Sequence, residues 1–285
     1  LCFPIIYLIS AFSGLIGQGG APRAAIYMGQ NKHTEANRIM NNCFVVLILE
    51  AVVLTVFFWF FGEQLLWLFG CSEQTIIYAL PYMQIYVSGS IFVMLALGMN
   101  LFITTQGFTR FSMTSVLIGA GANIILDPIL IFGLAFFPKM GISGAAIATG
   151  VGQLISLVVY LAFYFRGPVP VKLEARYKIP GGNTMKKLYG IGIPAILNLA
   201  LPSVMIFVLN GLLAQYSRSY VVILGIYYKL QTFLYFPASG IIQGMRPVIG
   251  YNFGAGERER VGKIYKITLA MAGVIMAAGT VLCLT

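Results

Sequence analysis

Asn123 and Asp127 are the residues of this 285-residue sequence whose types and spacing most clearly suggest chemistry. They lie in an apolar run from about Phe108 to Ala135, which is long enough to span a bilayer as a helix. Residues four apart share one helix face. Pro128 has no N–H, so the carbonyl of Ile124, one turn earlier, lacks its helical donor. A carboxylate, an amide and an unpaired carbonyl oxygen should therefore meet at one level of the membrane.

This group of oxygens predicts a site that binds a cation or a proton. A charged Asp at the centre of a bilayer costs about 2.5–3.5 kcal/mol on insertion scales, so Asp127 should face the protein interior and bind a partner there. Hard cations such as Na⁺ prefer oxygen ligands, and the same carboxylate can take up a proton instead. The alternative is structural, with a neutral Asp127 held by Asn123 as a packing contact between helices.

The composition identifies the class of protein. The chain is 59% hydrophobic and 9% charged, with a mean hydropathy of +0.88, whereas soluble proteins carry about 25% charged residues. We predict an all-α, polytopic protein of the plasma or inner cell membrane. Its expected partner is the lipid bilayer, and binding to nucleic acid is not expected. The four cysteines are far apart, so they predict neither a disulfide framework nor a metal site.

The spanning helices are predicted from apolar runs broken by polar residues, Gly or Pro. Eight spans result, at roughly 1–28, 41–61, 76–104, 108–135, 142–165, 185–215, 219–248 and from 261 onward. One set of connections holds thirteen cations, namely Lys32, Arg38, Arg110, Arg166, Lys172, Arg176, Lys178, Lys186, Lys187, Arg258, Arg260, Lys263 and Lys266. The opposite set holds only Lys139 and Arg218. The cation-rich side is therefore predicted to be cytoplasmic.

An internal repeat accompanies this topology. A shift of 225 residues superimposes Gln18 on Gln243, Gly19 on Gly244, Pro22 on Pro247 and Gly29 on Gly254. Both copies run from a span into a cytoplasmic connection, which predicts two six-helix lobes related by a parallel repeat. Four matches among common Gly and Pro residues could also arise by chance. The predicted domains are 1–165, a first lobe without its first span; 166–184, a cytoplasmic linker; and 185–285, the start of a truncated second lobe.

Two stretches resemble a known family. They are QGMRPVIGYNFGAG at 243–256, and NIILDPILIFG at 123–133 followed by MGISGAAIAT at 140–149. Along essentially the whole chain, the sequence resembles spans two to nine of the multidrug and toxic compound extrusion (MATE) family. The resemblance implies a secondary active antiporter that exports small amphipathic organic cations and drugs by alternating access. The exchanged ion would be Na⁺ or H⁺, with no cofactor.

The resemblance also implies a coupling site. In one branch of the family, a cation site uses an Asp of span one, an Asn and an Asp of span five, and a Thr of span six. Asn123 and Asp127 match the span-five pair, and Thr149 is the best match for the Thr, which implies Na⁺ or a proton at Asp127. The span-one Asp has no counterpart in the sequence. Another branch has an acidic residue in span seven, but no Asp or Glu occurs between Glu174 and Glu257. We therefore expect the coupling site in the first lobe.

Other residues are candidates from their position. Glu50 lies about ten residues into the second predicted span and is a candidate second acid, although we favour a hydrogen-bonded structural role. Aromatic and Met side chains suit a pocket for varied cations, but at helical spacing they also suit packing. The candidates for the substrate cavity are Met205, Phe207, Tyr227, Tyr228, Phe233 and Tyr235.

The predicted function is thus multidrug efflux by a monomeric transporter. An alternative from the same superfamily is a flippase for lipid-linked sugars, which would need a cavity rich in cations to bind pyrophosphate. An enzyme is not predicted, because the sequence has no metal-ligand spacing, no nucleophile motif and no paired acids within a span.

Overall fold

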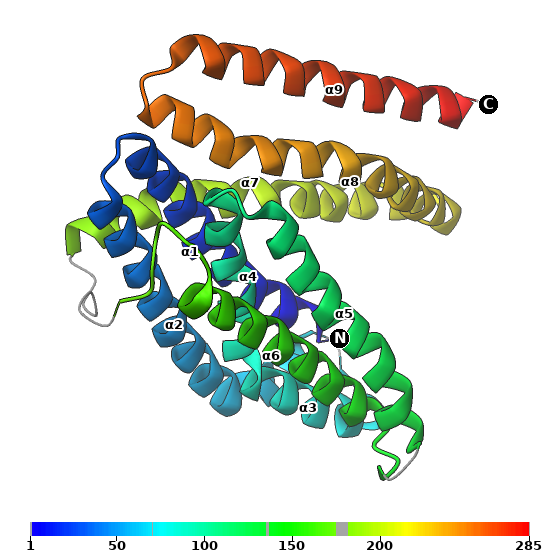
Figure 1. Ribbon diagram of the computed structural model, residues 1–285. Coiled ribbons are helices and arrows are strands. Elements are labelled where there is room, and N and C mark those ends of the chain that lie inside the picture. The colour runs from blue at the N-terminus through cyan, green and yellow to red at the C-terminus, as the bar shows by residue number, and fades with distance from the viewer. Residues whose placement is uncertain (1, 70, 135–136, 175–181, 285) are drawn as a thin grey trace. The chain divides into compact units, whose positions relative to one another are not determined.

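The computed structural model describes residues 2–69, 71–134, 137–174 and 182–284, and within these ranges every regular element is a helix. The helices are α1 (Phe3–Gly29), α2 (His33–Leu68), α3 (Glu73–Ser88), α4 (Ser90–Thr105), α5 (Thr109–Phe132), α6 (Ile142–Arg166), α7 (Gly182–Ala214), α8 (Arg218–Gly254) and α9 (Arg258–Leu284) (Figure 1). The predicted all-α class is confirmed.

The predicted spans agree with these helices, with one break and several longer ends. The predicted span 76–104 is two helices, α3 and α4, which bend by 52° where Gly89 caps both. Helix α2 extends beyond the predicted span at both ends. Of the described helices, α1, α2, α5, α6 and α9 are long and apolar enough to cross a membrane, and α3 with α4 passes the same test when the bent pair is counted as one span. For α7 and α8 the crossing stays a prediction.

The chain divides into two compact units. The first unit contains Leu1–Ala24 and His33–Gly192, and the second contains Ala25–Lys32 and Ile193–Thr285. In the first unit α5 packs along α6, α2 packs on α3 and α4, and α6 also contacts α3 and α4. This helix packing positions the candidate site.

The segment 167–174, which follows α6, is fixed to the predicted cytoplasmic end of the first unit. Val171 is buried, and its backbone N–H donates to Gln106 Oε1 at the end of α4 over 3.0 Å. The N–H of Glu174 donates to Asn41 Oδ1 of α2 over 2.7 Å. Positions 175–181 of the predicted linker lie outside the described residues. The segment 167–174 therefore forms part of the first unit.

In the second unit α8 packs along α9, and the last turn of α1 meets the last turn of α8. A Cβ added at Gly29 would collide with the carbonyl oxygen of Tyr251, and a Cβ added at Gly254 would collide with that of Ile26. The 225-residue shift carries Gly29 onto Gly254 and Ile26 onto Tyr251. The contact is thus reciprocal between the two copies of the repeat.

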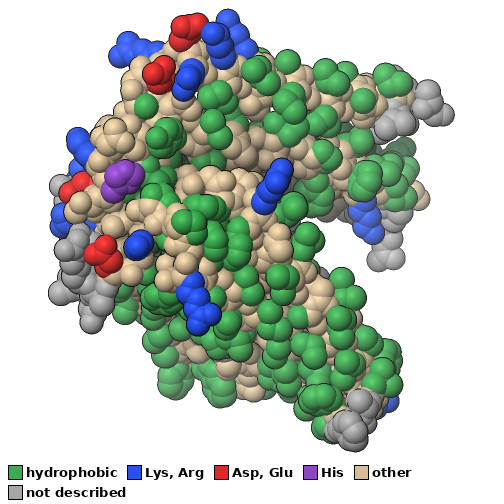
Figure 2. Space-filling view, in the orientation of Figure 1, with side chains coloured by type: hydrophobic (Ala, Val, Ile, Leu, Met, Phe, Trp, Pro, Cys, Tyr) green, Lys and Arg blue, Asp and Glu red, His purple; other side chains and the backbone are tan. Residues whose placement is uncertain are grey.

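Large hydrophobic side chains are exposed on the outer helix faces, among them Phe60, Leu117 and Ile124. Figure 2 shows such side chains over much of the visible face, with the few charged side chains mostly gathered near helix ends. Apolar outer faces with charges at the ends are the pattern of a protein whose solvent is lipid. The protein is therefore a multi-pass membrane protein.

Candidate functional site

The candidate site lies between α5 and α6 in the first unit. Helix α5 continues through Pro128 and ends at Phe132. The next residue, Gly133, has a φ of 72°, the left-handed conformation that commonly follows a helix. Helix α6 runs antiparallel to α5 after the short connection 134–141. Gly119 and Gly152 let the two helices approach closely, because a Cβ at Gly152 would lie 2.7 Å from the carbonyl oxygen of Gly119.

The structure brings the three predicted ligands together. The amide nitrogen of Asn123 lies 3.3 Å from Asp127 Oδ1 and 3.5 Å from Thr149 Oγ1, and all three side chains are half-buried. Thr149 Oγ1 donates to the carbonyl oxygen of Ala145 over 2.9 Å. Its lone pairs therefore stay available to accept.

This arrangement offers one carboxylate and several neutral oxygens. Asp127 supplies the charge and Thr149 Oγ1 supplies a neutral acceptor. The Asn123 amide presents its nitrogen to both, so it would have to turn its Oδ1 toward a bound cation. Pro128 leaves the Ile124 carbonyl of the same helix without its helical donor. Among the described residues, no three His, Cys, Asp or Glu side chains gather as metal ligands. A set of this kind suits a monovalent hard cation or a proton.

A cavity of about 200 Å³, with several polar side chains in a mostly apolar lining, adjoins this group between α4, α5 and α6. Its lining includes Asn123 and Thr149 at one end and Asn100 and Tyr160 at the other, with Gln153 between them. Sequence reasoning missed Asn100, Gln153 and Tyr160, because each is a single polar residue in an apolar run and only the packing of three helices brings them together.

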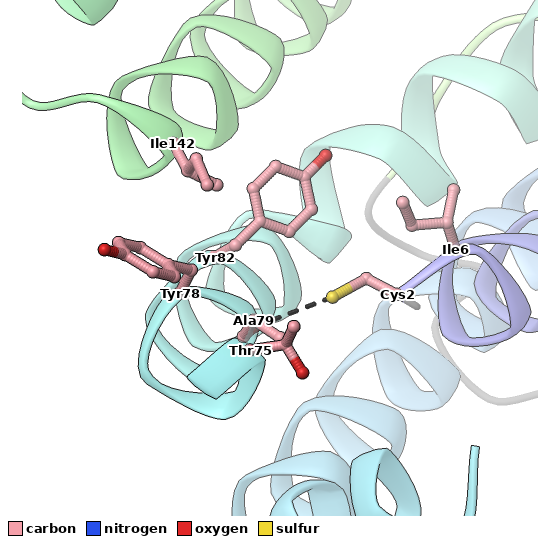
Figure 3. Close-up of a pocket in the computed structure, with 7 residues that line it drawn as sticks. All are labelled: Cys2, Ile6, Thr75, Tyr78, Ala79, Tyr82 and Ile142. Carbon is pink, nitrogen blue, oxygen red and sulfur yellow. Dashed lines mark hydrogen bonds between the residues drawn. The ribbon is translucent and has the colours of Figure 1, made fainter. Parts of the chain in front are cut away.

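A second cavity of the first unit, about 380 Å³ in volume, is mainly apolar. It is lined by Tyr78 and Tyr82 of α3, by Cys2 and Ile6 near the start of the chain, and by Ile142 of α6, and Figure 3 shows the two tyrosine rings at its wall. The i,i+4 spacing of these tyrosines was the available sequence signal.

The predicted substrate residues of α7 and α8 do not line one described cavity. Tyr227 lines a cavity of about 770 Å³ between α8 and α9, and its ring stands edge-on to that of Tyr228, with centroids 5.8 Å apart. Met205, Phe233 and Tyr235 are exposed, and no described cavity is lined by them. The side chain of Phe207 lies outside those that the structure describes.

Glu50 is placed apart from the Asp127 group. Its Oε1 accepts a hydrogen bond of 2.7 Å from the hydroxyl of Tyr189, at the start of α7. Its Oε2 is buried and has no hydrogen-bond partner among the described residues. This geometry favours the structural role, in which Glu50 fixes α7 to α2.

Comparison with known proteins agrees with this architecture. A family model described as MatE matches residues 1–129 and 194–285. The multidrug export protein MepA of Staphylococcus haemolyticus is 27% identical over 97% of this chain and 60% of its own length. MepA of Staphylococcus saprophyticus is 25% identical over 100% of this chain and 62% of its own length. The chain thus spans about three fifths of the length of these relatives.

Solved structures give the same result. A ligand complex of the MATE multidrug transporter DinF-BH aligns with a TM-score of 0.86 at 28% identity, over 99% of this chain and 62% of that one. A crystal structure of MATE in the bent conformation aligns with a TM-score of 0.90 at 21% identity, over 97% of this chain and 61% of that one, and so supports the fold alone. Because the family model matches more than half of the chain, the protein belongs to the MatE family, which confirms the resemblance seen in its sequence.

Proposed function

We propose that the protein acts in a secondary antiporter that exports amphipathic organic cations in exchange for Na⁺ or H⁺. The observation on which this proposal rests is the meeting of Asp127, Asn123 and Thr149 between α5 and α6. A single half-buried carboxylate surrounded by neutral oxygens can bind a monovalent cation or a proton and release it again. We propose Asp127 as the charged ligand and the other two as neutral ligands, with no cofactor.

The substrate class is proposed from the apolar cavity of the first unit. Its tyrosine rings, Tyr78 and Tyr82, suit the apolar body and positive charge of an amphipathic cation, since ring faces attract cations. The Asp127 carboxylate of the same unit would add electrostatic attraction. Two relatives are named as multidrug export proteins, and one solved relative is described as a multidrug transporter. We propose the same class of substrate for this chain.

The flippase alternative is not favoured. A site for the pyrophosphate of a lipid-linked sugar needs Lys or Arg. The residues that line the two cavities of the first unit include neither. We further propose that the chain works as a monomer, with a first lobe at 1–165, a linker at 166–184 that begins with the segment 167–174 held on the first unit, and the second lobe from 185.

The test is ethidium efflux from cells that express the protein, with and without a Na⁺ gradient and a pH gradient. We expect Asp127→Asn to reduce gradient-driven efflux by more than about tenfold, because a hydrogen bond or ion contact to a charged group contributes about 1.5–3 kcal/mol and 1.4 kcal/mol is a factor of ten. Glu63→Gln is the matched control, because it removes an exposed carboxylate of α2. That variant should retain wild-type efflux.

Glu50→Gln separates the two candidate acids. Loss of gradient-driven efflux in Glu50→Gln, with normal efflux in Asp127→Asn, would transfer the coupling role to Glu50 and overturn the proposed site. Absence of efflux from the wild-type protein, together with binding of an anionic lipid carrier, would instead support the flippase.

A further inference from the structure

The cavity between α4, α5 and α6, whose mostly apolar wall carries a row of polar side chains, extends well beyond the Asp127 group. Its lining on α6 runs from Thr149 to Tyr160, eleven residues or about 16 Å along the helix axis. On α5 the lining runs from Asn123 back to Val116, toward the predicted cytoplasmic end. The cavity is therefore elongated along the membrane normal, with the candidate site at its outer end.

Asn100 and Tyr160, which line the inner end of the cavity, belong to a chain of four hydrogen-bonded side chains. The amide nitrogen of Asn100 donates to the hydroxyl of Tyr160, and Ser112 Oγ donates to Asn100 Oδ1 over 2.8 Å. Thr104 Oγ1 in turn donates to Ser112 Oγ over 3.0 Å. Thr104 and Ser112 lie in the last turn of α4 and the first turn of α5. Polar groups thus continue from the cavity to the predicted cytoplasmic ends of these helices.

Gln153 connects the two ends. It stands one turn after Thr149 on α6, it is half-buried, and it lines the cavity. Its amide makes no hydrogen bond to another described residue, although both of its polar atoms could do so. In a cavity that also exposes Asn100, Ser156 and Tyr160, such a group is free to bind water or a passing ion.

We propose that this cavity is a hydrated route along which the coupling cation moves between Asp127 and the predicted cytoplasmic side of the first unit. Gln153 supplies an oxygen at the midpoint, and the Asn100 group supplies oxygens at the inner end. Without a carboxylate along the route, a cation is held weakly at each position and leaves readily. The inference rests on the proposed cation-coupled function.

The test compares Gln153→Leu with Gln84→Leu. Gln84 is a half-buried glutamine of α3 that does not line the cavity, so the control makes the same chemical change elsewhere in the same unit. Two measurements are made: gradient-driven ethidium efflux, and the rise in melting temperature of the purified protein with increasing Na⁺ at fixed pH or with changing pH at fixed Na⁺. The second reports equilibrium binding, since a ligand that binds the native state stabilises it.

We expect Gln153→Leu to slow efflux by about tenfold, because the barrier rises when an ion loses one polar partner. The cation-dependent rise in melting temperature should persist, because Asp127 is intact. Gln153→Asn keeps an amide and should restore efflux to within about threefold of wild type. Gln84→Leu should be unchanged in both measurements. Slow efflux together with a retained melting shift would show that Gln153 acts on the movement of the cation and not on its binding.

Two results would overturn the route. One is efflux in Gln153→Leu equal to that in Gln84→Leu. The other is equal loss of the cation-dependent melting shift and of efflux in both Gln153 variants, which would make Gln153 a ligand or a folding residue. The proposed function fails on a different result, namely an Asp127→Asn protein that keeps both the shift and the efflux.

Discussion

Glu50 illustrates at the residue scale how a half-buried acid is tolerated within a span. Its only described hydrogen bond comes from the Tyr189 hydroxyl, and its second oxygen is buried and without a described partner. An ionisable group at this depth usually marks either function or a specific partner. Here the partner is present, and it lies on α7, far along the chain. The hydrogen bond therefore joins the start of α7 to α2.

Tyr189→Phe should lower the free energy of unfolding by about 1 kcal/mol, because it leaves the half-buried Glu50 carboxyl without a hydrogen bond from a described residue. Thermal unfolding of the purified protein in detergent measures the change. Tyr78→Phe removes a hydroxyl from a mostly exposed ring of the same unit, and it should leave the melting temperature unchanged. Equal melting temperatures for the two variants would show that the Glu50 contact does not stabilise the protein.

Which residues could be foreseen depends on how local their signal is. Asn123 and Asp127 are neighbours on one helix, so their spacing alone predicts that they meet. Thr149 required the family resemblance, and Gln153 and Asn100 gave no signal, because only the packing of α4 against α5 and α6 joins them. The six aromatic and Met candidates had the right chemistry for a cation pocket. Residue type alone, however, does not determine which helix faces meet.

At the scale of the element, the crossing of α5 and α6 determines the geometry of the candidate site. Gly119 and Gly152 bring the two backbones together, and a Cβ at Gly152 would also stand 3.2 Å from the Cβ of Asn123. Small residues at a helix crossing in lipid permit close van der Waals packing. The distance between Asn123 and Thr149 therefore depends on these glycines.

Gly152→Ala should destabilise the protein by about 1–3 kcal/mol, the usual cost of overpacking, and should also reduce gradient-driven efflux by displacing Asn123. Gly150→Ala is the matched control, two residues away on α6, because no described atom lies within 4 Å of its added Cβ. Melting temperature and efflux are measured for both variants. A Gly152→Ala protein with wild-type melting temperature and efflux would show that α5 and α6 can move apart without loss of stability or transport.

The elements themselves were mostly predictable, because hydropathy reports burial in lipid directly. The exception is the span 76–104, where the bend at Gly89 divides α3 from α4. A glycine in an apolar run is compatible with a continuous helix, so composition could not reveal the bend. The first residues of α2 were missed because hydropathy detects only apolar runs, and a helix can continue beyond such a run into polar residues.

At the scale of the whole molecule, the repeat appears as a physical contact. Gly29 meets the Tyr251 carbonyl, and Gly254 meets the Ile26 carbonyl. Gly254 and Tyr251 are the residues that the 225-residue shift pairs with Gly29 and Ile26. The shift was inferred from a few matching residues. Apart from the pair Gly29 and Gly254, the residues that make the reciprocal contact are not among those matches, so the contact is a separate observation of the repeat.

Gly29→Ala and Gly254→Ala should each destabilise the protein by about 1–3 kcal/mol, because each added methyl group meets backbone. The double variant should cost less than the sum of the two, since both methyl groups open one contact and residues in contact are not additive. Gly244→Ala has no described atom within 4 Å of its Cβ and is the control. Strict additivity of the two changes, measured by thermal unfolding, would contradict a shared contact.

The contact between Gly29 and Gly254 also has a meaning for ancestry. In a two-fold symmetric dimer, residue i of one subunit meets j of the other, and j meets i. The α1 and α8 ends follow this rule within a single polypeptide. In a homodimer of a half-length chain, one glycine would fill both positions, so any mutation there would alter the interface from both sides. Fusion of two gene copies would have separated the two positions, leaving each free to change alone.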